Sequence, residues 1–311
     1  MSQHPTTGNG ANPTADSTAG NGAGPTAGTG ALTWVSVRTA SGEEPAVRDP
    51  GRGVCLVRDL IPDFGGGLID VMTGPRRDEI LRRAADADDG RFLAPDTVSW
   101  APPYRDPPII WGIGLNYVDH AADLSEVVPD EPASFLKGRH TIIGPGDPIT
   151  VPPQSQRTTA EAELGLVVGR RCRNIEPEQA MDHIAGFTTV LDQTAEDILA
   201  RNPRFLTRSK NFPGFFSFGP EIIPVSSLLR RYGALSEVKV ATVINGTVHR
   251  DNTVSRMRYS PEFLLSFHSK VMELPPGAII STGTPGARVI GSGDVVECRI
   301  EGFLPLRNPV R

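Results

Sequence analysis

The most constraining feature of the sequence is a pair of glutamates directly before an apolar run. Glu161 and Glu163 are two residues apart, and residues 164–168 (Leu-Gly-Leu-Val-Val) follow at once. On a β-strand the side chains alternate between faces with a period of two, so both carboxylates point the same way. Two like charges on a half-buried strand are costly unless something compensates them. The pattern therefore predicts either a divalent-cation site or two solvent-facing glutamates on an edge strand.

Composition narrows the class of protein. A chain of 311 residues can hold one large domain or two modest ones, and its net charge of −5 with scattered basic residues argues against a nucleic-acid partner. No apolar run approaches the length of a membrane span, and no signal peptide opens the chain. The three cysteines lie far apart, which is typical of neither a disulfide framework nor a zinc–cysteine site. We expect a cytoplasmic protein without a membrane partner.

The chain divides into three parts by composition. Residues 1–30 are almost wholly Gly, Ala, Thr, Asn and Pro, which predicts a disordered tail. Residues 31–107 predict a small N-terminal α/β unit, in which strands at 32–38 and 53–58 flank a Gly/Glu/Pro turn region and a helix covers 76–89. Residues 108–311 form the larger part, which begins after a proline-rich link.

The larger part reads mainly as short strands. We expect strands at 109–117, 132–137, 159–170, 187–191, 278–281 and 295–300, and a hairpin around Asn245-Gly246. Short helices are expected at 177–183, 194–201 and 261–272, and residues 210–220 read as a loop. The strand at 187–191 would deliver Asp192 to a strand-to-helix junction. The pattern predicts a mostly β, α+β fold, because neither a βαβ alternation nor a Gly-rich nucleotide-binding motif is present.

A second pair of polar residues follows the first strand of the larger part. His120 and Asp123 are three residues apart, so on a helical turn they are neighbours that can hydrogen-bond. A carboxylate that orients an imidazole is the arrangement a general base needs. The alternative is an exposed His–Asp pair on a helix turn.

Several motifs in one order resemble the fumarylacetoacetate hydrolase family over roughly residues 109–311. They are Gly114-Leu115-Asn116-Tyr117-Val118-Asp119-His120, Glu161-Ala162-Glu163-Leu164, Asp192, Lys210, Gly219-Pro220, Val243-Ile244-Asn245-Gly246, and Pro276-Gly277 with Thr282-Gly283-Thr284-Pro285. The resemblance implies a mixed β-sandwich roll, a homodimer, and a site for Mg²⁺, Mn²⁺ or Ca²⁺. It also implies a small-molecule carbonyl or carboxylate substrate.

The resemblance assigns roles to individual residues. Glu161, Glu163 and Asp192 would be the metal ligands, and His120 with Asp123 would form the base. Lys210 would neutralise an enolate or oxyanion, although Lys137 is an alternative on the predicted sheet. Tyr117, Gly283 and Thr284 would contact the substrate. A cation of this kind chelates a 2-oxo acid or 1,3-diketone and stabilises the enolate as a Lewis acid.

Two positions depart from the family pattern and bear on the substrate. Glu196 stands where an arginine is usual, and Leu199 stands where a glutamine commonly contacts the substrate. Because arginine recognises carboxylates through its planar fork, a glutamate there would repel one. Either Arg201, Arg204 or Arg208 supplies the charge from a shifted position, or the substrate is larger and less anionic.

Three functional hypotheses follow. The favoured one is a metal-dependent hydrolase or lyase that cleaves a C–C bond next to a carbonyl in an acylpyruvate-like substrate. The second is a tautomerase, isomerase or decarboxylase of 2-oxo or 2-hydroxy-enoate acids at the same site. The third is a non-catalytic paralogue, which the charged cluster argues against because such a cluster costs stability.

Overall fold

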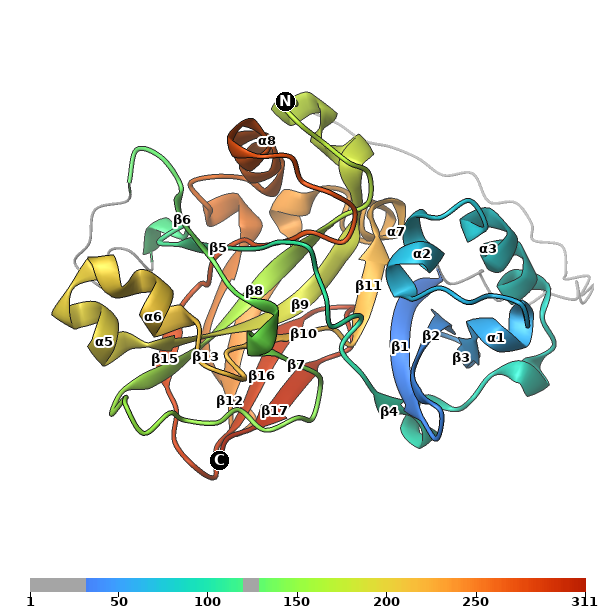
Figure 1. Ribbon diagram of the computed structural model, residues 1–311, viewed down its shortest axis with the longest axis horizontal. Coiled ribbons are helices and arrows are strands. Elements are labelled where there is room, and N and C mark those ends of the chain that lie inside the picture. The colour runs from blue at the N-terminus through green and yellow to red at the C-terminus, as the bar shows by residue number, and fades with distance from the viewer. Residues whose placement is uncertain (1–31, 120–128) are drawn as a thin grey trace, which may run out of the picture.

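The computed structural model describes residues 32–119 and 129–311, and strands form its framework (Figure 1). The strands are β1 (Thr33–Thr39), β2 (Gly42–Asp49), β3 (Gly53–Leu56), β4 (Ser99–Trp100), β5 (Ile110–Gly114), β6 (Ala133–Leu136), β7 (Ile142–Ile143), β8 (Thr158–Val168), β9 (Ile184–Ala195), β10 (Phe216–Phe218), β11 (Glu221–Pro224), β12 (Lys239–Ile244), β13 (Thr247–Thr253), β14 (Ile279–Ser281), β15 (Ala287–Val289), β16 (Val295–Ile300) and β17 (Leu306–Pro309).

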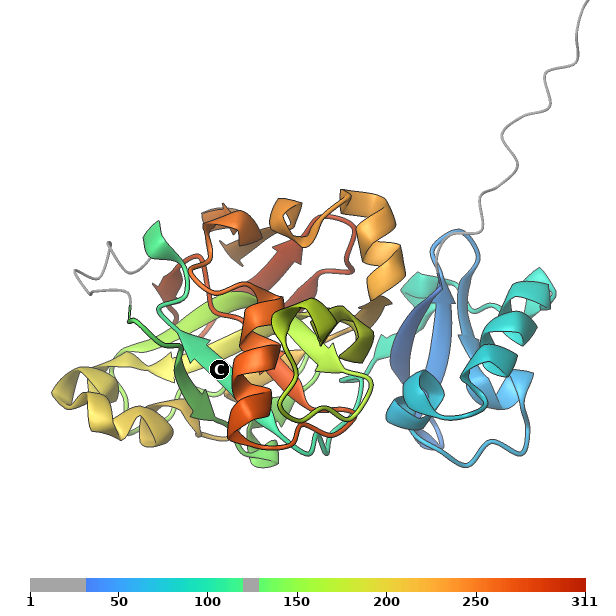
Figure 2. The same ribbon diagram turned by 90° about the horizontal axis from the view of Figure 1, so that it is seen from above.

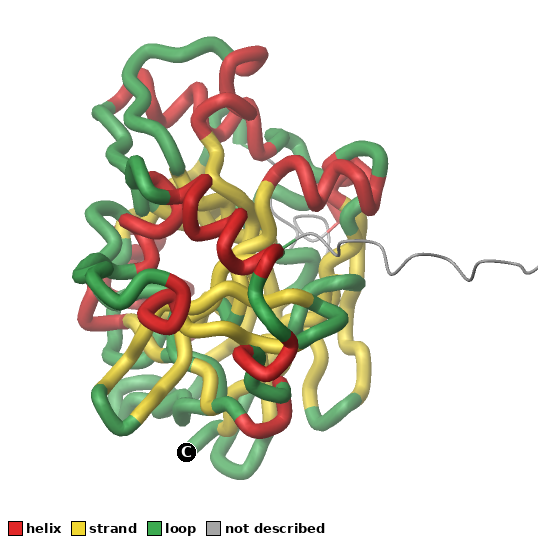
Figure 3. The backbone as a smooth tube through the Cα atoms, turned by 90° about the vertical axis from the view of Figure 1, so that its right-hand side faces the viewer, coloured by secondary structure: helices red, strands yellow, loops and turns green. Residues whose placement is uncertain are grey.

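Short helices connect the strands and lie mostly around the strand framework (Figure 3). The α-helices are α1 (Val57–Leu60), α2 (Leu68–Thr73), α3 (Arg77–Asp86), α5 (Glu196–Arg201), α6 (Leu206–Lys210), α7 (Val225–Tyr232) and α8 (Pro261–Val271). The 3₁₀ helices are η1 (Asp89–Arg91), η2 (Pro95–Thr97), η3 (Arg139–Thr141), η4 (Pro177–His183), η5 (Pro203–Phe205), η6 (Leu235–Glu237) and η7 (Val254–Arg256). No helix among the described residues has both the length and the apolar character that a membrane crossing requires.

The strands of the described residues form two sheets. The larger has 13 strands, with the path β3-β2-β1-β11-β9-β8-β14-β5-β6 and with β4, β7, β10 and β15 attached beside it. The smaller has four strands in the order β13-β12-β16-β17. Antiparallel pairs predominate, and the parallel pairs are β5 with β14 and β7 with β10. The expected α+β, mostly β fold without a βαβ array is confirmed.

The pair β8–β9 is the central element of the larger sheet. The two strands run antiparallel from the pair Thr158–Ala195 to the pair Val168–Ile184, and each has a further neighbour on its other side. One face of the pair packs on the smaller sheet in a core that includes Leu164. The other face carries Val167 and belongs to a core shared with the N-terminal unit. The edge-strand alternative for the glutamate strand is therefore wrong.

The N-terminal unit lies beside the larger part and shares its main sheet (Figure 2). Strand β1 pairs with β11 through Trp34 opposite Ile222, so the sheet is continuous across the two parts. The expected turn region between β1 and β3 is wrong, because β2 forms there and pairs with both neighbours. Pro45 lies beyond the portion of β2 that pairs with β3, where a strand tolerates proline.

Two further expectations for the larger part are corrected, and two are confirmed. Strand β9 continues three residues past Asp192, so this aspartate lies within a strand rather than at a strand-to-helix junction. The expected loop after Lys210 contains β10, which adds to β9 by long-range pairing. The Asn245-Gly246 hairpin forms as β12 and β13, with positive φ at both turn residues. Helix α8 begins as expected, with Ser260 as its N-cap.

Candidate metal centre and active site

The central strand pair brings three carboxylates together on one face. Glu161 of β8 lies directly opposite Asp192 of β9, and Glu163 lies one side-chain row further along the same face. One oxygen from each of the three carboxylates lies within 4.8 Å of the others. The side chain of Asp192 is 1% exposed and that of Glu161 is 13% exposed. The period-two argument from the sequence thus correctly placed both glutamates on the same side, and the structure brings to them Asp192, which the resemblance had named with them.

Neutral donors hold two of these carboxylates in place. Glu163 Oε2 accepts hydrogen bonds from Ser281 Oγ at 2.6 Å and from the backbone N–H of Gly283 at 2.7 Å. Glu161 Oε1 accepts hydrogen bonds from Thr194 Oγ1 at 2.6 Å and Thr159 Oγ1 at 3.2 Å. Strands β8, β9 and β14 therefore all contribute to orienting the cluster, and such supporting bonds tune a metal site.

Two buried lysines contact the same cluster. Lys210, at the end of α6, lies 3.0 Å from Glu161 Oε2 and 2.8 Å from Asp192 Oδ2. Lys137, directly after β6, donates to Asp192 Oδ1 and, at 3.3 Å, to the carbonyl oxygen of Gln193. The Nζ of Lys210 also lies 4.7 Å from the centre of the Phe135 ring. The sequence posed Lys210 and Lys137 as alternatives, and the structure brings both into the site.

Burial and neighbouring charge shift the pKa values in this cluster. Burial raises the pKa of Glu163 to about 8, and the charge of Asp192 adds to the rise. Burial lowers the pKa of Lys137 to about 8, against the attraction of Asp192. For Lys210, burial lowers the pKa, but Asp192, Glu161 and Glu163 outweigh it and hold the value above its ordinary one. The ammonium of Lys210 is thus firmly charged at neutral pH.

The donor set fits a hard divalent cation. Three carboxylates face two lysine ammoniums, so with all five groups ionised the cluster retains one negative charge. Carboxylate oxygens are the ligands that Mg²⁺, Mn²⁺ and Ca²⁺ prefer. Glu161, Glu163 and Asp192 are the residues that would hold such an ion, with Lys137 and Lys210 beside it.

The remaining residues that the sequence singled out are placed as follows. Tyr117 is fully buried, its hydroxyl has no hydrogen-bond partner within the described part of the chain, and burial with the charge of Glu163 raises its pKa. Gly283 gives its N–H to Glu163, and the hydroxyl of Thr284 bonds to the carbonyl of Gly286. Both expected substrate donors thus already have protein partners. His120 and Asp123 lie outside the described residues.

Sequence reasoning missed the supporting hydroxyls of the cluster. Thr159 is two residues before Glu161 and Thr194 is two residues after Asp192, so each shares a strand face with a carboxylate of the cluster. That spacing was a signal that could have found them. Ser281 had no such signal, because it reaches Glu163 from a strand more than a hundred residues away.

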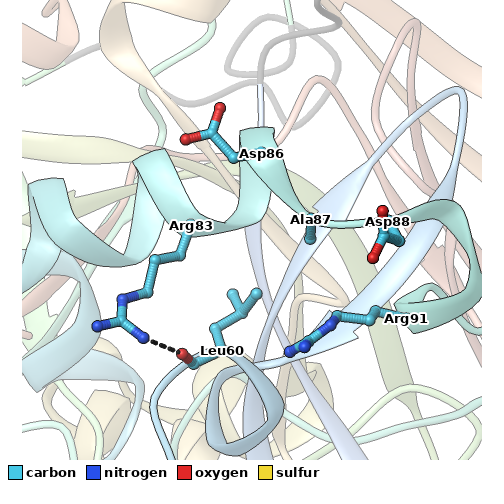
Figure 4. A pocket seen from close by; sticks show the side chains of 6 residues that line it. All are labelled: Leu60, Arg83, Asp86, Ala87, Asp88 and Arg91. Atoms are coloured by element: carbon cyan, nitrogen blue, oxygen red, sulfur yellow. Dashed lines mark hydrogen bonds between the residues drawn. The ribbon is translucent and has the colours of Figure 1, made fainter.

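A separate hollow of about 240 Å³ lies in the N-terminal unit (Figure 4). It is lined by Leu60, Arg83, Asp86, Ala87, Asp88 and Arg91. The guanidinium of Arg83 donates a hydrogen bond to the backbone carbonyl of Leu60 at 2.9 Å. The guanidinium of Arg91 donates to the backbone carbonyl of Asp59 at 2.6 Å. The formal charges of its two arginines and two aspartates cancel, and none of its lining residues belongs to the carboxylate cluster.

Comparisons with known proteins agree with this geometry. The family profile for the fumarylacetoacetate (FAA) hydrolase C-terminal domain matches residues 109–311. The mitochondrial oxaloacetate tautomerase FAHD2B of Homo sapiens is 35% identical over 70% of this chain and 69% of its own. A crystal structure of 5-carboxymethyl-2-hydroxymuconate delta-isomerase from Mycobacterium smegmatis is 28% identical with a TM-score of 0.70, covering 89% of this chain and 98% of that one. A fumarylacetoacetate hydrolase from Exiguobacterium antarcticum is 25% identical with a TM-score of 0.72, covering 90% and 99%.

Proposed function

Because this chain belongs to the fumarylacetoacetate hydrolase family, we propose that it is a divalent-metal-dependent tautomerase of a 2-oxo dicarboxylic acid. The observation that carries the proposal is the convergence of Glu161, Glu163 and Asp192 with two buried lysines. A similar human protein is named an oxaloacetate tautomerase, and a similar structure is named an isomerase. These names favour proton transfer over C–C cleavage, which the sequence alone had placed first.

A bound divalent cation would supply Lewis-acid stabilisation of negative charge on the substrate oxygens. Glu161, Glu163 and Asp192 would hold it, since the donor chemistry of these residues fits. The hydroxyls of Thr194 and Ser281 keep two of the three carboxylates from rotating. Such preorganisation removes the cost of ordering the ligands when the substrate arrives.

The two lysines would stabilise the negative charge that develops on the substrate during the reaction. Removing a proton from the carbon next to the 2-oxo group places negative charge on the substrate oxygen. The ammonium of Lys210 is fixed by Glu161 and Asp192, so it presents preorganised positive charge without moving. Lys137 adds a second ammonium on the other oxygen of Asp192. His120, oriented by Asp123, is the proposed base that moves the carbon-bound proton.

The experiment follows the absorbance of the enol form of oxaloacetate. We expect the Mg²⁺-loaded protein to accelerate the keto–enol exchange well beyond Mg²⁺ alone, and the Glu163→Gln variant to lose this acceleration. The Glu273→Gln variant, altered in an exposed ion pair with Arg171, is the matched control and should behave as wild type. Exchange at the rate of Mg²⁺ alone in the wild type would refute the tautomerase proposal.

The second candidate is hydrolysis of a C–C bond in an acylpyruvate. It is favoured by the likeness to a solved fumarylacetoacetate hydrolase and uses the same carboxylates and lysines. Here His120 would activate water instead of moving a substrate proton. Incubation of an acylpyruvate in ¹⁸O-labelled water separates the two reactions, because only hydrolysis places ¹⁸O in a newly formed carboxylate.

The proposal extends to the oligomeric state of the protein and its location in the cell. We retain a homodimer and a cytoplasmic location from the family resemblance and from the cysteines. Cys55, Cys172 and Cys298 are free and buried, which supports a reducing compartment. Light scattering at micromolar concentration tests the dimer, and cell fractionation tests the location.

A further inference from the structure

An ion pair continues the row of side chains that leads away from the carboxylate cluster. Arg157 directly precedes β8 and Glu196 directly follows β9, and the backbone N–H of Glu196 donates to the carbonyl of Arg157 at 2.9 Å. This bond extends the β8–β9 ladder by one pair. The Nε of Arg157 donates to Oε2 of Glu196. The two side chains therefore cross the ends of the same two strands that build the candidate metal centre.

Strand periodicity places this pair on the face of the cluster. Positions 159 and 161 of β8 share one side, as do positions 192 and 194 of β9, and the added pair 157–196 continues this alternation by one step beyond the strand ends. Four residues along a strand correspond to about 13 Å. Between the two ends, Thr159 and Thr194 both donate to Glu161 Oε1 and form a continuous polar row. A short dicarboxylate and an extended arginine side chain together span that distance.

The ion pair leaves the recognition edge of the guanidinium open. Glu196 engages Arg157 through Nε, on the side of the planar group. One N–H from each of the two terminal nitrogens faces away from the chain and forms the end-on fork that recognises a carboxylate through two parallel hydrogen bonds. The side chain of Arg157 is 58% exposed, so this fork is accessible to a ligand.

The other arginines nearby are placed differently. Arg201, Arg204 and Arg208 lie on α5, η5 and α6, further along the chain from the ends of the strand pair. Arg201 lies 4.0 Å from Asp197 of its own helix, and Arg208 donates to Gln154. Arg157 is thus the arginine of these four that lies directly at the end of the strand pair, where its backbone and its side chain both bond to Glu196.

We propose that Arg157, oriented by Glu196, binds the distal carboxylate of a 2-oxo dicarboxylic substrate whose other end lies at the carboxylate cluster. This inference rests on the proposed function for the class of substrate. Glu196 acts as a positioning residue: it fixes one edge of the guanidinium so that the other edge faces the ligand. The arginine makes the site selective for diacids over monoacids of the same length.

The test is the affinity of the Mg²⁺-loaded full chain for malate, a 2-hydroxy dicarboxylate that does not tautomerise, and for its 4-methyl ester. Calorimetry should show that wild type binds malate at least tenfold more tightly than the ester, because hydrogen bonds to a charged group stabilise binding by that order. Arg157→Ala should weaken malate binding about tenfold and leave ester binding unchanged. Arg157→Lys should recover part of the loss, since a lysine supplies charge without the fork.

Arg171→Ala, at the exposed ion pair with Glu273, is the matched control, and it should bind both ligands as wild type does. Equal affinity of wild type for malate and its ester, absence of malate binding in wild type, or equal weakening of both ligands by Arg157→Ala would each overturn the proposal. Should Arg157→Ala not fold, Arg157→Gln gives the same comparison with more of the side chain retained. Failure of oxaloacetate tautomerisation would refute the proposed function but not this selectivity, because malate binding needs no turnover.

Discussion

Two buried carboxylate centres in this protein differ in how their charge is balanced. Glu221, where the N-terminal unit joins the larger part, is 1% exposed and accepts hydrogen bonds from Thr33 at 2.8 Å, Arg48 at 3.0 Å and the backbone N–H of Leu304 at 2.6 Å. One carboxylate thus faces one guanidinium, and both oxygens are satisfied. The cluster on β8 and β9 gathers three carboxylates against two ammoniums.

The comparison distinguishes an ion pair whose charges cancel from a cluster whose charges do not cancel when all its groups are ionised. A closed pair at Glu221 has no charge left over, so it can only fasten the two parts of the chain together. With all five groups ionised the cluster carries one surplus negative charge, and burial together with the charge of Asp192 raises the pKa of Glu163, which favours its protonated form. Evolution tolerates such a surplus in a protein interior where a cation or substrate compensates it.

The largest expected effect is a loss of stability when the ion pair at Glu221 is broken. Arg48→Met keeps much of the side-chain volume but leaves the carboxylate of Glu221 buried without its cation. We expect the free energy of unfolding, measured by urea denaturation, to fall by about 3 kcal/mol or more. Arg171→Met, at the exposed pair with Glu273, is the control and should cost less than about 1 kcal/mol. A small loss for Arg48→Met would show that the Glu221 pair does not fasten the two parts.

The next prediction concerns turnover at the cluster on β8 and β9. Lys210→Ala removes the fixed ammonium beside Glu161 and Asp192. Turnover should fall at least a hundredfold, as it does when one preorganised donor to a developing oxyanion is lost, whereas metal affinity should stay nearly intact. Steady-state kinetics and a metal titration of the same preparation measure both quantities. Near-wild-type turnover would remove Lys210 from the mechanism and leave Lys137 as the alternative.

A smaller effect is expected from the groups that orient the ligands. Thr194→Val deletes the hydroxyl that donates to Glu161 Oε1 at 2.6 Å while keeping the shape of the side chain. Loss of one supporting bond should weaken Mg²⁺ binding about tenfold. Thr253→Val, which removes an exposed hydroxyl bonded to Ser255, is the matched control. Unaltered Mg²⁺ affinity in Thr194→Val would mean that Glu161 is not a ligand whose orientation matters.

The smallest effect comes from a buried titratable group that belongs to neither centre. His268 packs against Trp111 with ring centres 4.6 Å apart, and burial lowers its pKa. Below the ordinary pKa of about 6.5 the unfolded chain takes up a proton that the folded protein resists, so stability falls as the pH drops through this window. Wild type should therefore lose more thermal stability between pH 7.5 and 5.5 than His268→Gln. Equal losses would contradict this assignment.

The sequence could predict what depends on local pattern. The shared face of Glu161 and Glu163 follows from their spacing, the Asn245-Gly246 hairpin from its turn chemistry, and helix α8 from its cap. Family resemblance, rather than local pattern, proposed Asp192 as a ligand, and its place within β9 was not predicted. The shared face, the hairpin and the helix cap depend on residues that are neighbours in sequence, which is why the sequence alone predicts them.

What the sequence could not predict depends on contacts between distant segments. The Glu221 centre joins residues from both parts of the chain, and its carboxylate carries no local signature of burial. Strand β10 has only three residues (Phe-Ser-Phe), too few for their alternation to predict a strand, and it forms by pairing with β9. Lys137 and Lys210 come from segments more than seventy residues apart, so only the fold shows that both reach Asp192.

The most direct test of the account is a calorimetric Mg²⁺ and Mn²⁺ titration of three proteins. Wild type and Glu221→Gln should bind the ion with similar affinity, because the Glu221 centre is closed and structural. The double variant Glu161→Gln/Glu163→Gln should show no binding, because two of the three ligand carboxylates have lost their charge. Binding in the double variant equal to that of wild type, or no binding in wild type, would contradict the claim that the cluster on β8 and β9 is a metal centre.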